Sequence, residues 1–148
     1  MTELKTLLEE TGTELKPLNQ QEQWKLKQKW RENYSQGVKE RTGKWIHNGF
    51  DWHAFSYGFA TASSGEKAFA EYRAVCAKDF FVVPEDFSGQ IGYRCYGISL
   101  PDLSSLGDDL YVFPPSMEWT MAFTHEGPDM GPYFARKEWQ KLASIRSR

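Results

Sequence analysis

The segment from residue 79 to residue 125 most constrains the fold, because it alternates short aromatic and β-branched runs with turns. Each run is five to eight residues long, and the segments between them contain proline, glycine or paired acidic residues. Runs of this length and composition are typical of β-strands, and the shortest connections join antiparallel neighbours. The four predicted strands are 79–83, 91–96, 109–113 and 118–125.

A fifth predicted strand, 52–59, contains the run Trp-His-Ala-Phe-Ser-Tyr. Side chains alternate between the two faces of a strand, so His53 falls in a row with aromatic residues. The same alternation in 118–125 places His125 at the end of a row of large apolar residues. Each histidine therefore borders the predicted core, and the two imidazoles meet if these strands pair near them.

Helices are predicted on both sides of the strand-rich segment. Asn19 and Glu22 have the spacing of a capping box and open a helix whose apolar residues recur every four positions. That apolar stripe consists of Leu26, Trp30, Tyr34 and Val38. Further helices are predicted over 2–10, from an N-cap at Ser63 to about Cys76, and from Pro132 towards the C-terminus.

These elements predict an α+β fold with a mostly antiparallel sheet of about five strands. We expect the helices to pack mainly on one face, with one helix at each terminus. A chain of 148 residues fits a single domain. We divide it into a helical N-terminal arm (1–44), a core that contains the sheet (45–131) and a C-terminal helix (132–148).

The sequence predicts a cytoplasmic protein. It shows no basic and apolar signal segment at its start, and no stretch approaches eighteen apolar residues. Cys76 and Cys95 lie in separate predicted elements, and we expect both to be reduced thiols.

Charge is distributed unevenly along the chain. The net charge is +2 over residues 1–44, −8 over 45–134 and +4 over 135–148. An acidic body with interleaved aromatic residues favours a basic protein partner, because carboxylates steer the encounter and aromatic rings anchor it. The predicted partner-binding face consists of Asp102, Asp108, Asp109, Tyr111, Glu118 and Trp119. The function predicted first is therefore non-catalytic protein binding, for example by an immunity-type protein that covers a basic toxin domain.

The two histidines at the border of the predicted core support a second hypothesis, a small enzyme or a ligand-binding protein. Its candidate pocket consists of His53, Tyr57, Tyr93, Cys95, His125, Glu126 and Tyr133. The alternative is that both histidines are structural residues at the border of the core. No metal or other cofactor is predicted, because the chain has no His-Glu-x-x-His, His-x-His or Cys-x-x-Cys spacing. No catalytic residue is assigned, although a Ser-His or Cys-His pair stays open.

Basic residues on the second helix and in the tail support a third hypothesis, association with nucleic acid. They are Lys25, Lys27, Lys29, Arg31, Arg136, Lys137, Lys141, Arg146 and Arg148. A solvated helix face explains them more simply, and the acidic body would repel a polyanion. Nucleic acid is therefore an unfavoured partner, no membrane contact is expected, and the oligomeric state is left open.

Several motifs together resemble a family of small bacterial proteins catalogued only as a domain of unknown function. They are the run at 52–57, Thr-His-Glu at 124–126 and Gly-Pro-Tyr-Phe at 131–134. The helix from Gln23 to Tyr34 and the Ser-Gly-Glu-Lys-Ala run at 64–68 extend the likeness over nearly the whole chain. The resemblance implies a shared fold and no particular reaction. Small acidic bacterial proteins of this build also resemble the neutralising partners of toxins.

Overall fold

The structure is a computed structural model that describes residues 3–86, 90–127 and 129–140. Its centre is a seven-stranded sheet with the order β1-β4-β3-β5-β6-β7-β2, and every neighbouring pair is antiparallel. The predicted α+β class is confirmed, with seven strands where about five were expected. The strands are β1 (Glu14–Pro17), β2 (Ser63–Ser64), β3 (Asp79–Pro84), β4 (Tyr93–Tyr96), β5 (Leu110–Phe113), β6 (Trp119–Phe123) and β7 (Tyr133–Arg136).

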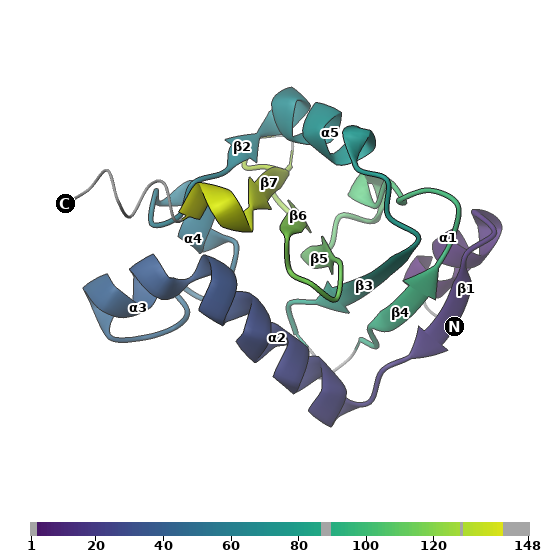
Figure 1. Ribbon diagram of the computed structural model, residues 1–148, viewed down its shortest axis with the longest axis horizontal. Helices are drawn as coiled ribbons and strands as arrows, with labels where there is room; N and C mark the ends of the chain where they lie inside the picture. The colour runs from purple at the N-terminus through teal and green to yellow at the C-terminus, as the bar shows by residue number, and fades with distance from the viewer. Residues whose placement is uncertain (1–2, 87–89, 128, 141–148) are drawn as a thin grey trace.

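Helices cover both faces of this sheet, which corrects the expectation that they lie mainly on one face (Figure 1). They are α1 (Glu3–Glu10), α2 (Gln20–Tyr34), α3 (Gln36–Thr42), α4 (His53–Ser56), α5 (Gly65–Ala74) and the short 3-10 helix η1 (Ser104–Leu106). One apolar core lies between the sheet and α1 with α5, and the other lies between the sheet and α2 with α4.

Strand β3 shows why two cores form. Phe80 and Val82 face the first core, whereas Phe81 and Val83 face the second. Side chains that alternate between two buried faces leave a continuous apolar run in the sequence. The predicted strands 79–83, 109–113 and 118–125 all contain such runs, and each corresponds to a strand of the sheet.

The capping box before α2 is confirmed. The Asn19 side chain accepts a hydrogen bond from the Glu22 backbone N–H, and the Glu22 carboxylate accepts one from the Asn19 backbone N–H. The helix ends at Tyr34, and α3 begins at Gln36 after the intervening Ser35. Trp30 and Tyr34 from the predicted stripe are buried against the sheet.

The prediction of a strand over 52–59 is wrong, because this segment forms the helical turn α4. The backbone N–H of Phe55 donates to the Trp52 carbonyl at 2.9 Å, and that of Tyr57 donates to the His53 carbonyl at 3.1 Å. Residues 51–55 are all buried. In a short segment whose residues are all buried, the pattern of apolar residues does not distinguish a helix from a strand. The alternation of aromatic and small residues was therefore not evidence for a strand.

The opposite error occurs at the C-terminal end. The predicted helix from Pro132 is the strand β7, which pairs with β6, and helix begins only at residue 137. A proline is tolerated at the border of a strand, so it does not by itself indicate a helix start. The part of the predicted C-terminal helix from residue 141 to residue 148 lies outside the described residues.

Two short strands were not predicted. β1 pairs with β4 at one edge of the sheet, so part of the predicted N-terminal arm belongs to the sheet itself. β2 pairs with β7 at the other edge, and α5 begins at Gly65 after Ser64. Ser63 is therefore a strand residue and not the predicted N-cap. Within the described residues, no helix is both long and apolar enough to cross a membrane.

Candidate functional site

A buried ionic network lies between α2 and the sheet. The Lys27 ammonium, with its side chain 1% exposed, lies 2.6 Å from a carboxylate oxygen of Asp51 and 3.0 Å from one of Glu85. Arg31 binds the same Asp51 carboxylate through Nε at 2.9 Å and Nη2 at 3.2 Å. Three elements distant in sequence are thus joined by charged contacts: helix α2, the segment before α4, and the end of β3.

The two carboxyl groups of this network have pKa values that move in opposite directions. Burial raises the pKa of Glu85 from 4.5 to about 7, and the Asp51 carboxylate beside it adds to the increase. The pKa of Asp51 falls from 3.8 to about 2 although burial opposes the change, because Lys27 and Arg31 both stabilise its charged form. Asp51 is therefore the permanent anion, and Glu85 exchanges its proton near neutral pH.

The network continues through Tyr111 to the backbone of the segment before α4. The Tyr111 hydroxyl donates to the Glu85 carboxylate and accepts from the Trp52 backbone N–H at 2.9 Å. The Asp51 backbone N–H donates to the same carboxylate at 2.8 Å. Both peptide groups at Asp51 and Trp52 are held by buried polar side chains, so the position of this segment is fixed from beneath.

Trp52 connects the buried network to a histidine near the surface. Its indole Nε1–H donates to Asp109 Oδ1 at 2.9 Å, and His125 Nδ1 lies 2.9 Å from both oxygens of that carboxylate. The hydrogen bond to Asp109 raises the pKa of His125 above 6.5. His125 Nε2 lies 3.6 Å from a Glu126 carboxylate oxygen. The carboxylate on Nδ1 thus favours the positively charged form of the imidazole, and in the neutral form it leaves Nε2 available as a base.

All three histidines of the chain belong to one group of aromatic rings. Ring contacts run from His47 to Tyr57 at 4.6 Å, from Tyr57 to His53 at 5.1 Å, from His53 to Phe50 at 5.4 Å and from Phe50 to His125 at 5.0 Å between centroids. We call these five residues the histidine surface. Tyr57 is 52% exposed, whereas His53 is buried and its Nδ1 lies 2.9 Å from the His47 carbonyl oxygen.

The structure brings together part of the predicted histidine pocket. His53, Tyr57, His125, Glu126 and Tyr133 lie around Phe50 and Trp52, with Tyr133 stacked on Trp52 at 6.0 Å. Tyr93 and Cys95 do not join them, because both face the core beneath α1 and α5. Burial raises the pKa of the Cys95 thiol to about 12.

His125 reaches this group by a route that the sequence did not predict. Trp119, Met121 and Phe123 share the face of β6 that packs beneath α5, as the alternation predicts. The strand ends at Phe123, and His125 crosses to the opposite side, where Phe50 and Trp52 lie.

The predicted partner-binding face does not form a single surface. Tyr111 and Trp119 are both buried, and they belong to the two different cores. Asp109 and Glu118 lie at opposite ends of the β5–β6 hairpin. The Asp102 carboxylate lies in another region and binds Ser104. Asp108 precedes Asp109, the residue that contacts His125.

Sequence reasoning missed Lys27, Asp51 and Glu85 as a group. A usable signal existed for Lys27, because Gln23, Lys27, Trp30 and Tyr34 recur at the spacing of one helix face and all four are buried. No comparable signal exists for Asp51 or Glu85, which are acidic residues in connecting segments. Among the described residues, no three His, Cys, Asp or Glu side chains are arranged to hold a metal ion.

Residues 3–134 match the family described as a domain of unknown function, DUF4275. The chain belongs to this family, which confirms the resemblance inferred from the sequence. No curated protein and no solved structure matches the chain.

Proposed function

We propose that this member of the DUF4275 family binds a protein partner through the histidine surface. The observation that carries the proposal is the way this surface is supported: the chain beneath it is bound by two polar side chains of the interior, Glu85 and Tyr111. Asp51 and Trp52, which link Phe50 to His53, each have their backbone N–H bound from below. A surface that is already ordered loses little entropy on binding, which favours affinity.

The composition of the surface fits a protein interface. Tyr57 is exposed and Phe50 is half-buried, and aromatic side chains dominate the binding energy of most interfaces. Carboxylates of Glu126, Asp129 and Asp108 lie in the segments around His125 and would attract a basic partner. An immunity-type protein that covers a basic toxin site would use such a surface.

The test is binding to the products of the genes that flank this one, each purified separately. We expect one product to bind with an affinity that falls as salt rises, because the carboxylates steer the encounter. Tyr57→Ala and Glu126→Lys should each weaken binding at least about tenfold, the effect of a central contact. Glu66→Lys, on the exposed face of α5, is the matched control and should bind as the parent does.

The proposal fails if no flanking product binds, or if the Tyr57 and Glu126 variants bind as tightly as the control. The immunity-type role has a separate test in living cells. Co-expression should protect cells from a toxic flanking product, and Tyr57→Ala should reduce that protection. If a flanking product binds but co-expression does not protect the cells, the proposed interface stands and the immunity role is excluded.

The pair formed by Asp109 and His125 favours a second candidate function, acid–base catalysis on a small substrate. A carboxylate on Nδ1 orients the imidazole and leaves Nε2 available for proton transfer. Activity screens should then separate His125→Asn from the parent, and the active preparation should lose rate below the pKa of His125. If His125→Asn and His53→Ala both behave as the parent in every assay, catalysis at this edge is excluded.

A further inference from the structure

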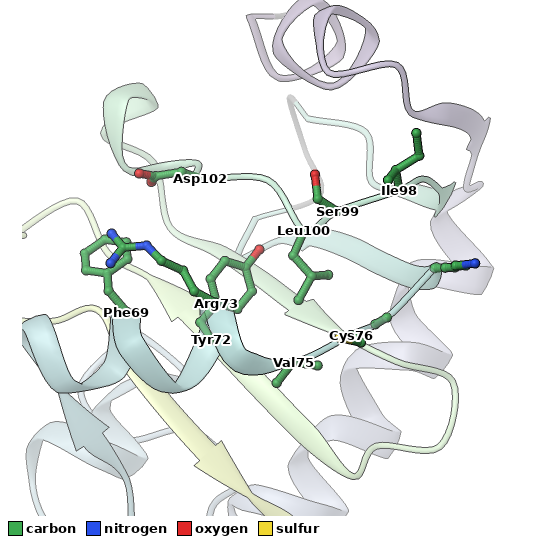
Figure 2. Close-up of a pocket in the computed structure, with 11 residues that line it drawn as sticks. Phe69, Tyr72, Arg73, Val75, Cys76, Ile98, Ser99, Leu100 and Asp102 are labelled. Carbon is green, nitrogen blue, oxygen red and sulfur yellow. The ribbon is translucent and has the colours of Figure 1, made fainter.

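The cleft beside α5 has the volume of a small-molecule site, about 560 Å³, but its charges do not select a ligand. Figure 2 shows Arg73 and Asp102, which carry opposite charges, at the same end of the cleft. The second cation, Lys78, lies at the opposite end. The residues that carry a specific chemistry lie elsewhere, in the turn that joins His47 to Phe50.

Asn48 and Gly49 form this turn at the edge of the histidine surface. The residues on either side of it, His47 and Phe50, are joined by an isolated antiparallel bridge. Both turn residues have a positive φ, 53° for Asn48 and 90° for Gly49, as a two-residue type I′ turn requires. Because the bridge belongs to no strand of the sheet, local opening of the turn breaks no strand ladder.

The side chain of Asn48 is loosely held. Among the described residues its one hydrogen bond joins Nδ2 to the Tyr57 hydroxyl, at 3.1 Å. Asn48, Gly49 and Tyr57 are all exposed. The carboxamide is therefore open to water.

The backbone nitrogen of Gly49 lies next in the chain and can act as a nucleophile towards this carboxamide. In the part of the chain that the structure describes, the Gly49 N–H donates to no acceptor. A Cβ built on Gly49 would meet no atom within 4 Å, and glycine has no side chain of its own to shield the nitrogen. The attacking nitrogen is thus both unbound and uncrowded.

We propose that Asn48 is a deamidation site. The Gly49 nitrogen loses its proton to water and attacks Asn48 Cγ, so that an N–Cγ bond forms. The Cγ–Nδ2 bond then breaks, and Nδ2 takes up a proton from water and leaves as ammonia. A second water opens the resulting succinimide at either of its carbonyls, which leaves aspartate or isoaspartate at position 48. The net reaction consumes one water and releases one ammonia.

The conversion changes the charge of the histidine surface. A neutral amide that donates to the Tyr57 hydroxyl is replaced by a carboxylate, which is ionised at neutral pH and cannot donate. The site itself does not depend on the proposed function, because the reaction needs only this chain and water.

The other two asparagines of the chain are internal controls. The Asn19 side chain accepts from the Glu22 backbone N–H as the cap of α2, and the next residue is Gln20. Asn33 Nδ2 donates to a backbone carbonyl within α2 at 2.8 Å, and the next residue is Tyr34. Helical structure and a following side chain hinder ring closure at both, so we expect neither to convert as fast as Asn48.

The test follows the folded chain during incubation at neutral and at mildly alkaline pH. Each asparagine lies in a different tryptic peptide, so mass spectrometry assigns the exchange of NH₂ for OH to one residue. We expect the peptide 45–67 to gain this mass first, as a mixture of aspartate and isoaspartate. The rate should rise with pH, because the Gly49 nitrogen must lose its proton. Asn48→Gly is the matched variant, since glycine accepts the positive φ of the turn, and its peptide should show no gain.

Two results would overturn the proposal. One is conversion of Asn48 that is no faster than that of Asn19 or Asn33 in the folded protein. The other is a product that contains aspartate without isoaspartate, because direct hydrolysis needs no ring closure by Gly49. Neither result bears on whether a protein partner binds the histidine surface.

Discussion

Replacing Glu85 with glutamine should change how the stability of this protein depends on pH. Glutamine resembles the protonated carboxyl: it is neutral, and its amide oxygen can still accept from the Asp51 N–H. In the folded protein the pKa of Glu85 is about 7, whereas its ordinary value is 4.5. In Glu85→Gln that titration is absent at every pH.

Whether stability rises or falls with pH depends on which state, folded or unfolded, keeps the Glu85 proton. Between pH 4.5 and about 7 the folded parent keeps the Glu85 proton while the unfolded chain releases it. The parent is therefore stabilised below pH 4.5 and loses that contribution as the pH rises through the folded value. At about 1.4 kcal/mol for each pH unit, the loss amounts to about 3 kcal/mol by pH 8. The stability of Glu85→Gln relative to the parent should rise by this amount.

The assay is urea unfolding followed by tryptophan fluorescence at intervals from pH 4.5 to pH 8.5. Asp109 raises the pKa of His125, but this group is the same in both proteins, so its contribution cancels in the difference. Glu66→Gln, which removes an exposed carboxyl on α5, is the matched control for the exchange of glutamate for glutamine. If the Glu85→Gln difference varies with pH no more than the control difference does, Glu85 is already ionised in the folded state at pH 5 and burial does not govern its titration.

Three other substitutions test separate contacts. Asp109→Asn removes the hydrogen bond that raises the pKa of His125, so an NMR titration of the imidazole should show that pKa falling towards 6.5. Thr120→Val leaves the buried Trp30 indole N–H without its acceptor at 2.9 Å, and urea unfolding should show a loss of about 1–3 kcal/mol. Gly37→Ala would place a methyl carbon 2.4 Å from a backbone oxygen of the loop after α4, and overpacking of this kind costs about 1–3 kcal/mol in the same assay.

The sequence predicted the centre of the sheet well because each central strand is a run of buried apolar residues. β3, β5 and β6 lie within one or two residues of the segments 79–83, 109–113 and 118–125. The strands at the two edges, β1 and β2, are short and partly polar, with exposed residues in both. Edge strands of this kind resemble loops in sequence, so the fold class could be predicted and the strand count could not.

The histidine edge was predicted for a reason that the structure does not support. We placed His53 and His125 together by pairing two strands, yet His53 begins a helical turn and His125 follows the end of β6. They meet through Phe50 and Trp52, which contact both imidazoles. His53 is buried and His125 is exposed, so aromatic neighbours in the sequence do not by themselves indicate that a histidine is buried.

The buried charges beneath residues 50–53 raise the question of what they contribute. Breaking a buried ion pair is costly, yet a well-packed apolar replacement of the whole network is often as stable. Stability alone therefore does not account for Lys27 and its two carboxylates. Their geometry offers a different reason: Glu85 accepts hydrogen bonds from the Asp51 N–H and the Tyr111 hydroxyl, and that hydroxyl accepts from the Trp52 N–H. Apolar side chains could fill the same space without binding these peptide groups, so the polar network supplies the segment beneath the histidine surface with hydrogen-bond partners that an apolar core would lack.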